Sequence, residues 1–361
     1  MRLMTLLLVL ALWLPAQVKM SVNQLLGMVR SSIKLKHPDK QVGEYLRKVQ
    51  LTEKLDDSTI ETLLGEGIGP KTLESLKILR DATGNFEKPK VIPPKPAAPV
   101  IPAPPTAEVN RIIEKSREYA LAYDKSLPNF LCIQVTRRFV DPAGLELWNK
   151  VDTVTSKLTY FEHQEQKQVM FVNNKYVDMD YSKLGGGATS TGEFGSLLRE
   201  IYEPQTEALF GWERWATLRG RLHYVINYRV LQSKSKWTIH HGTSDRQVVP
   251  AYHGLVYVDK DYLSVSRVVM EAEDIPVDFP VQMAKTQLDY DFTEIGGQPF
   301  LLPLRSELRM RDGKVLVKNE AEFRTYRRFG SDSSITFDVN EPISEEKLKE
   351  TPPVVKPIVK K

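Results

Sequence analysis

Residues with chemically useful side chains occur in a glycine-rich stretch, GGGATSTGEFGS, at residues 185–196. It holds Ser190 among small residues, as a nucleophilic serine on a sharp turn requires. Its glycines could also cradle a phosphate, but the Gly-Lys-Ser/Thr ending of a phosphate loop is absent. Such a serine turn belongs to a parallel sheet, and the flanking sequence predicts antiparallel strands. Ser190 and Glu193 have the spacing of a helix capping box, so we expect a helix start here. Hydrolysis at Ser190 remains an alternative.

A second stretch with possible chemistry is GIGPK, Gly67–Lys71. Residues 59–79 around it resemble a helix-hairpin-helix, which holds a nucleic-acid backbone through N–H groups at the start of its second helix. Lys71 is the one basic residue of this loop, and Glu66 and Glu74 flank it, whereas binding driven by counterion release requires several cations. We therefore expect no nucleic-acid partner, and nucleic-acid binding through this loop remains the less favoured alternative.

The histidines and carboxylates do not form a metal-binding pattern. His240 and His241 are neighbours on an expected strand, so their side chains point to opposite faces. There is no His-Glu-x-x-His sequence, and the single cysteine, Cys132, cannot build a Cys-based zinc site. Asp289 and Asp291 alternate on one expected strand face, which is typical of a solvated side. We predict no metal, no cofactor and no catalytic residue.

The N-terminus indicates export. The sequence MRLMTLLLVLALWLPAQ has the basic residue Arg2, an apolar run from Leu3 to Leu14 and a small-residue exit, as a secretory signal peptide does. We predict that residues 1–16 are this signal and that the mature chain is periplasmic or secreted. The run is shorter than the roughly 20 apolar residues that cross a bilayer, so we expect no transmembrane segment after its removal. A net charge of +4 over 361 residues gives no strong field towards nucleic acid or membrane.

Composition divides the rest of the chain into four parts. Residues 20–86 carry apolar side chains at helical spacing between capping residues and predict a small all-helical domain, with Pro38-Asp39 ending one helix and capping the next. Residues 87–106 contain eight prolines and predict a stiff linker. Residues 107–340 predict the main domain. The charged, proline-rich residues 341–361 predict a disordered tail.

The main domain begins with a helical pattern and continues as a series of alternating segments. Asn173-Asn174, Gly296-Gly297 and Asp312-Gly313 separate neighbouring segments as the turns of β-hairpins do. Short turns between successive strands predict a single antiparallel sheet and not alternating βαβ units. The expected fold class is therefore α+β, with a curved antiparallel half-barrel and covering helices at residues 108–123 and 193–202.

A long antiparallel sheet curls, so one apolar face must be filled by side chains or must enclose a cavity. In the helix expected at 193–202, four apolar side chains fall on one face. They are the candidate ligand-binding residues, as a lid over the sheet: Phe194, Leu197, Leu198 and Ile201. Plain core packing of the same residues is the alternative.

Residues 108–338 resemble the periplasmic lipoprotein-carrier superfamily of half-barrels. The resemblance lies in the order of the elements, in FLLP at residues 300–303 and in the spacing Asn319-x3-Phe323-x2-Tyr326-x2-Phe329. The chain is also similar to exported bacterial proteins with a helical front end and a proline linker. In the carriers the concave apolar face holds acyl chains beneath helices, which by position implies the lid just named. The insert at 185–192 and the helical front domain depart from the carriers.

These features predict an exported, non-enzymatic binding protein. The expected partner is a hydrophobic ligand, namely an acyl chain, a lipid or an apolar polypeptide segment, held in the curved sheet. The alternative is a cell-envelope interaction or scaffold protein whose barrel is fully packed and which binds an envelope protein.

Overall fold

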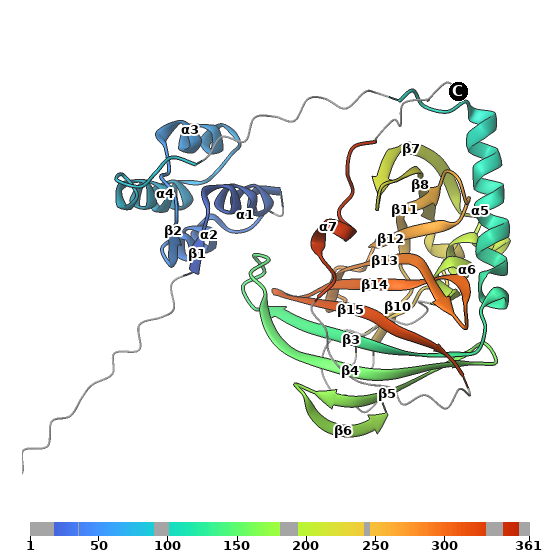
Figure 1. The fold of residues 1–361 in the computed structure, drawn as a ribbon. Coiled ribbons are helices and arrows are strands. Elements are labelled where there is room, and N and C mark those ends of the chain that lie inside the picture. Colours follow the sequence, from blue (N-terminus) through green and yellow to red (C-terminus); the bar gives the residue numbers. More distant parts are fainter. Residues whose placement is uncertain are drawn as a thin grey trace, which may run out of the picture. The chain divides into compact units, whose positions relative to one another are not determined.

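The computed structural model describes residues 18–34, 36–89, 101–180, 194–241, 246–329 and 342–353. The chain separates into two compact units, Met1–Lys95 and Pro96–Lys361, and the division falls inside the expected proline-rich linker (Figure 1). The expected signal peptide and most of the linker lie outside the described residues.

In the described residues 18–34 and 36–89, the first unit contains four helices and two short parallel strands. Leucines from all four helices are fully buried and form its core, which explains the helical spacing of its apolar residues. The expectation of an all-helical domain is wrong in one respect, because Val18–Met20 and Val49–Leu51 pair as parallel strands. Three-residue strands are too short to show an alternating pattern. The elements are β1 (Val18–Met20), α1 (Val22–Lys34), α2 (Asp39–Leu46), β2 (Val49–Leu51), α3 (Asp57–Gly65) and α4 (Pro70–Ala82).

The second unit is built on an antiparallel sheet of 11 strands, in the order β6-β5-β4-β3-β15-β14-β13-β12-β11-β8-β7. The strong curvature of this sheet is plain in Figure 1. These strands are β3 (Phe130–Asp141), β4 (Asn149–Phe161), β5 (Gln164–Val172), β6 (Lys175–Asp180), β7 (Leu209–Leu218), β8 (Arg221–Val230), β11 (Ala251–Asp259), β12 (Val265–Glu273), β13 (Val281–Ile295), β14 (Gln298–Asp312) and β15 (Val315–Arg328). A separate two-stranded antiparallel ribbon consists of β9 (Ile239–His241) and β10 (Arg246–Val248). The α+β class and the curved antiparallel sheet agree with the sequence-based expectation.

The hairpin turns lie where the sequence predicts them. Asn173 and Asn174, between β5 and β6, both have positive φ, 48° and 63°. Gly296 and Gly297 between β13 and β14 are also left-handed, as is Gly313 between β14 and β15. Positive φ is the backbone geometry of two-residue hairpin turns, so these residue types fix the connections and the antiparallel order of neighbouring strands.

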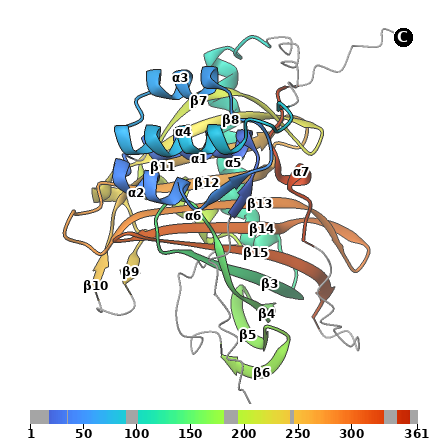
Figure 2. The ribbon, with the colours of Figure 1, turned by 90° about the vertical axis from the view of Figure 1, so that its left-hand side faces the viewer.

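Different segments cover the two faces of the large sheet. The long helix α5 and the short helix α6 pack on what we call the inner face, and α7 lies on the opposite, outer face (Figures 1 and 2). Figure 2 shows α7 in front of the strands and α5 behind them. The helices are α5 (Thr106–Ser126), α6 (Ser196–Tyr202) and α7 (Glu345–Leu348), with single 3-10 turns η2 (Pro204–Thr206) and η3 (Gln232–Lys234).

The main core lies between the inner face and these two helices. It includes Cys132, which is fully buried on β3, and Phe130, which lies two residues earlier on the same face of that strand. Because side chains alternate along a strand, every second residue from Tyr224 to Val230 of β8 enters this core, and the residues between them face outwards.

Residues 342–353 differ from the disordered tail that composition predicts for 341–361. They form α7 and then bridge Thr351 to Thr217 on the edge strand β7. Charged and proline-rich residues lower the chance of a hydrophobic core, but this segment is held by hydrogen bonds and ion pairs to the sheet, which composition does not reveal.

Candidate functional site

The inner face carries one continuous apolar and aromatic cluster. On β8, Tyr224, Ile226 and Tyr228 alternate into it, which is the period-two pattern expected of a strand with one buried face. Helix α5 adds Ile112 from the other side. Further strand side chains of the cluster are Phe130, Leu158, Tyr160, Tyr252, Leu288, Tyr290, Leu302 and Phe323.

Phe194 enters this cluster from a segment that is not part of the sheet. Its ring centroid lies 5.2 Å from that of Phe130, 5.9 Å from that of Tyr160 and 5.6 Å from that of Phe323. These separations are typical of favourable aromatic pairs. The three strand residues therefore form an aromatic cage, and Phe194 fills it. Because the cage is closed to water, a group that replaced Phe194 would have to be apolar.

The other expected lid residues lie on α6. Leu198 and Ile201 are fully buried against the inner face, and Leu197 is half-buried against the same cluster. The three residues of α6 thus pack against the same inner-face cluster as Phe194, and contact of these four residues with a ligand remains a prediction. The helix begins at Ser196, later than expected, after Gly195 with a φ of 121°. The capping box at Ser190 and Glu193 lies outside the described residues.

Polar contacts attach α6 to its surroundings. The Tyr202 hydroxyl donates to Ser116 Oγ of α5 at 3.0 Å, and the Tyr252 hydroxyl donates to the Glu200 carbonyl oxygen at 2.9 Å. Lys236 Nζ donates to Glu203 Oε2 at 2.7 Å. Burial raises the pKa of the Glu200 carboxyl. Helix α6 is therefore held by its apolar face and by a few side-chain bonds at its C-terminal end.

The inner face becomes polar towards one end of β3 and β4. Arg138 donates from Nε and Nη2 to the two carboxylate oxygens of Asp152, at 2.7 Å and 2.5 Å. Gln134 Nε2 donates to Thr136 Oγ1 at 3.2 Å. The inner face therefore carries the aromatic cage towards the start of β3 and a two-bond ion pair towards its other end.

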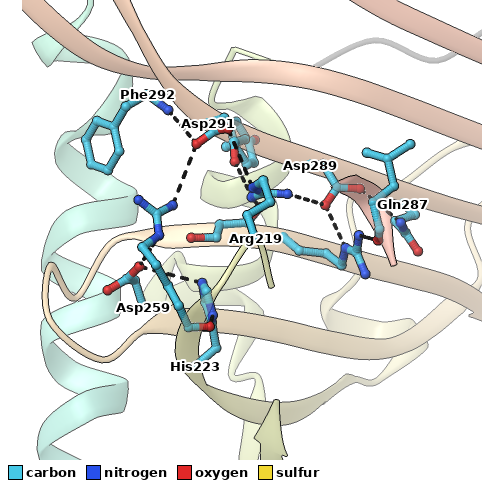
Figure 3. Close-up of polar contacts among 12 residues, drawn as sticks. Arg219, His223, Asp259, Gln287, Asp289, Asp291 and Phe292 are labelled. Atoms are coloured by element: carbon cyan, nitrogen blue, oxygen red, sulfur yellow. Dashed lines mark hydrogen bonds and ion pairs between the residues drawn. The ribbon is translucent and has the colours of Figure 1, made fainter. Parts of the chain in front are cut away.

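The outer face holds a network of three arginines and three aspartates (Figure 3). Asp289 accepts from Arg267 Nε at 2.7 Å and lies 3.4 Å from Arg219 Nη1. Its side chain is 1% exposed, so the expectation of a solvated Asp289 is wrong. A carboxylate can be buried here because two guanidinium groups replace its hydration.

The second half of this network surrounds His223. Arg221 Nε lies 2.9 Å from Asp259 Oδ2, and Asp291 lies between Arg221 and Arg219 at 3.7 Å and 3.6 Å (Figure 3). His223 is fully buried, with Nδ1 2.9 Å from the Arg221 carbonyl oxygen and Nε2 3.7 Å from Asp259. Burial lowers the pKa of His223 to about 4. The three cations and three anions balance while His223 is neutral, which is an arrangement suited to holding strands together.

Arg219 explains how this network links distant strands. It lies in the tight turn between β7 and β8, with φ of 49°, next to Gly220 with φ of 75°. From that turn Arg219 Nη2 donates to the Tyr290 carbonyl oxygen of β13 at 2.6 Å. The turn of the edge hairpin is thereby tied to a central strand, and the curl of the sheet brings the two together.

A groove of about 480 Å³ also opens on the outer face, and the sequence gives no sign of it. Gly254 forms part of its lining. A Cβ at this position would lie 1.8 Å from the Val269 carbonyl oxygen, so the close approach of the two backbones requires glycine. The charged side chains around it pair with one another, as Lys285 does with Glu271 at 2.8 Å. We assign no ligand to this groove.

The hairpin loop of the first unit has its helix start occupied by a carboxylate. Asp39 Oδ2 accepts from the Lys71 N–H at 2.8 Å, and Asp39 Oδ1 accepts from the Thr72 N–H at 3.0 Å. A phosphate held by this module would need the same N–H groups. Asp39 is the first residue of α2 and caps α4, which corrects the expectation that it caps its own helix. The Lys71 ammonium itself pairs with Glu74 at 3.1 Å.

Two other observations concern only the part of the chain that the structure describes. Within it, no three His, Cys, Asp or Glu side chains are grouped so that they could hold a metal ion. None of its helices combines the length and apolar character needed to cross a bilayer.

Comparison with known proteins gives matches among solved structures. No protein-family model matches the chain, and no curated protein matches it. The similar structures include a LolA superfamily protein from Nitrosomonas europaea, with 11% identity, 61% of this chain and 92% of that chain covered, and a TM-score of 0.28. A DUF1329 family protein from Desulfovibrio piger has 10% identity, coverages of 61% and 95%, and a TM-score of 0.33.

A third similar structure is a Vibrio parahaemolyticus domain described as an outer membrane lipoprotein-sorting protein. It has 11% identity, coverages of 62% of this chain and 94% of that chain, and a TM-score of 0.31. Two of these structures carry the name of the carrier group with which residues 108–338 are compared in the sequence analysis.

Proposed function

We propose that the second unit is a non-enzymatic binding module that holds an apolar chain against the inner face, beneath α6, in an exported protein. The ligand class is an acyl chain, a lipid or an apolar polypeptide segment. The observation that carries this proposal is the aromatic cage of Phe130, Tyr160 and Phe323, which is filled by a side chain from outside the sheet.

Phe194 behaves in this proposal as an internal occupant that a ligand replaces. It lies two residues before the start of α6, and α6 is held at its other end by the hydrogen bonds of Tyr202, Glu200 and Glu203. Each such bond contributes about 1 kcal/mol net. A ligand that buries comparable apolar surface can therefore offset the displacement of Phe194, at about 25 cal/mol per Å².

Binding of the fluorescent probe N-phenyl-1-naphthylamine to the mature chain tests this proposal. Phe194→Ala empties the cage without adding polar groups, so we expect the probe to bind about tenfold more tightly than to the wild type, equivalent to about 1.4 kcal/mol. The matched control is Phe161→Ala, because Phe161 is 40% exposed and lies outside the inner-face cluster.

Mass spectrometry of the purified protein under native conditions provides a second readout. Co-purified lipid or acyl chain, lost on organic extraction, would support the proposal. Equal probe binding by Phe194→Ala and Phe161→Ala, with no co-purified lipid, would refute it.

The second candidate is an interaction or scaffold protein whose interior is simply packed. The full burial of Phe194, Leu198 and Ile201 among the aromatic side chains favours it. On this alternative, Phe194→Ala lowers stability and leaves probe binding unchanged, so the same pair of variants separates the two functions.

A further inference from the structure

Residues 342–353, which we call the tail segment, cross the outer face from β15 to β7. The Ile343 N–H donates to Glu322 Oε1 of β15 at 3.1 Å, and Glu345 lies 3.9 Å from Arg305 of β14. Further along, the tail segment reaches β12, β11 and β7. Residues 330–341 connect it to β15.

The centre of this contact is a binding site for one carboxylate. Glu350 accepts from Arg214 Nε at 3.1 Å and from Arg214 Nη2 at 2.8 Å, and it also accepts from the Tyr257 hydroxyl at 2.8 Å. Two parallel bonds from one guanidinium group are the strongest arrangement for recognising a carboxylate. Burial, followed by the charge of Glu350, raises the pKa of Tyr257 to about 12, so its hydroxyl remains a donor at neutral pH.

Two guanidinium groups lie against the Tyr257 ring and help to fix the side chains of this carboxylate site in place. The Arg214 Cζ lies 5.8 Å and the Arg267 Cζ 5.5 Å from the ring centroid. Arg267 is itself fixed by Asp289, and its Nη2 donates to the Leu348 carbonyl oxygen. The sheet thus holds Arg214, Tyr257 and Arg267 in a fixed arrangement that can hydrogen-bond both a carboxylate and a main-chain carbonyl group.

The backbone of the tail segment also forms hydrogen bonds with the sheet. The Thr351 N–H donates to the Thr217 carbonyl oxygen at 3.0 Å, and the Thr217 N–H donates back at 3.1 Å. Thr217 lies on β7, an edge strand of the sheet, where unoccupied N–H and C=O groups accept a further strand. Pairing with an edge strand, with side-chain sites for alternate residues, is a common mode of peptide recognition.

The attachment is mainly polar, and Leu348 is the one buried apolar side chain of the tail segment. A segment held in this way, with few apolar contacts, opens locally at a lower free energy than the strands beneath it. A competing segment of the same chemistry can therefore take its place.

We propose that Arg214, Tyr257, Arg267 and the edge of β7 form a docking site for an extended acidic peptide of another polypeptide, with the pattern Leu-x-Glu-Thr. The tail segment, with Leu348, Glu350 and Thr351, occupies this site within the chain. Covalent attachment gives the tail segment an effective concentration on the order of 1 mM. A partner therefore binds when its concentration and affinity together exceed those of the tail segment, or when the tail segment is released. The site lies on the opposite face from the aromatic cage and is independent of the proposed apolar ligand.

The test uses the full-length mature chain and a fluorescein-labelled peptide with the sequence of residues 342–353, followed by fluorescence anisotropy. Leu348→Ser combined with Glu350→Gln releases the tail segment in the protein. Glu346→Gln is the matched control, because Glu346 is an exposed glutamate of the same helix. We expect the released variant to bind the peptide about tenfold or more tightly than the wild type or the control.

Two further measurements make the result specific. A peptide with glutamine in place of Glu350 should bind the released variant about tenfold more weakly, and adding Arg214→Ala to the released variant should abolish the difference between the peptides. Far-ultraviolet circular dichroism checks that each variant is folded, and the single variant Glu350→Gln serves if the double variant is not. Equal binding by the wild type and the released variant, or equal binding of both peptides, overturns the proposal.

Discussion

Lowering the pH should charge a buried histidine and weaken the second unit. His223 is fully buried beside Arg219 and Arg221, which leaves no favourable place for a further positive charge. Burial, together with these arginines, lowers the pKa of His223 to about 4, against the opposing effects of the Arg221 carbonyl and Asp259. In the unfolded chain the same side chain titrates near its ordinary pKa of about 6.5.

The size of the effect follows from this difference. Between about pH 6.5 and pH 4 the unfolded chain binds a proton that the folded chain does not, so the free energy of unfolding falls as the pH falls. At about 1.4 kcal/mol per pKa unit, the difference corresponds to a total loss of about 3 kcal/mol, of which about 2 kcal/mol is lost by about pH 4.5. Above about pH 6.5 the contribution of His223 to stability is fully present.

Urea unfolding followed by tryptophan fluorescence measures this loss. Apart from Trp13 in the expected signal peptide, every tryptophan lies in the second unit, so the signal reports that unit alone. His223→Asn keeps a donor for the Arg221 carbonyl and cannot be charged. Between about pH 7 and pH 4.5, we expect the free energy of unfolding to fall by about 2 kcal/mol less in this variant than in the wild type.

The exposed residue His240 provides the control for general effects of pH on the chain. His240→Asn should retain the pH dependence of the wild type. If His223→Asn and the wild type lose stability equally between neutral and acidic pH, the reasoning from burial and neighbouring charge is refuted.

Three further substitutions test other parts of the structure. Phe194→Ala should cost about 3–5 kcal/mol in urea unfolding, whereas Phe161→Ala at a partly exposed position should cost about 1 kcal/mol or less. Gly254→Ala should cost about 3 kcal/mol or more, since its Cβ would lie 1.8 Å from the Val269 carbonyl oxygen, and an unchanged urea midpoint would contradict this. Asp39→Ala should cost about 1 kcal/mol by uncapping α4, seen as faster amide hydrogen exchange in its first turn; unchanged exchange would count against that cap.

The sheet could be predicted because its information is local. Asn173, Asn174 and Gly313 adopt the left-handed conformations that their residue types favour, and each of these turns fixes a pair of neighbouring strands. Period-two alternation then identifies the buried face, as Tyr224, Ile226 and Tyr228 show. Leu197, Leu198 and Ile201 lie together because helical spacing places them on one side of α6, whereas Phe194 precedes the helix.

The outer face could not be predicted because its contacts join distant parts of the chain. An aspartate on a strand face has the same local sequence pattern whether water or an arginine lies next to it. The sequence around Asp289 therefore does not reveal its ion pairs with Arg267 and Arg219. Glu350 and Arg214 are likewise far apart in sequence, and composition alone describes the tail as a solvated segment. The capping of α4 by Asp39 is a third such contact.

The burial of Cys132 makes the folding of this protein measurable by thiol chemistry. It is the single cysteine of the chain and is fully buried on the inner face, so reagents reach its sulfur only when that face opens. In an oxidising compartment the same burial would keep two native molecules from becoming cross-linked, while chains still unfolded would remain open to that reaction. The rate at which Cys132 is alkylated therefore measures how often the core of the second unit opens, without any introduced label.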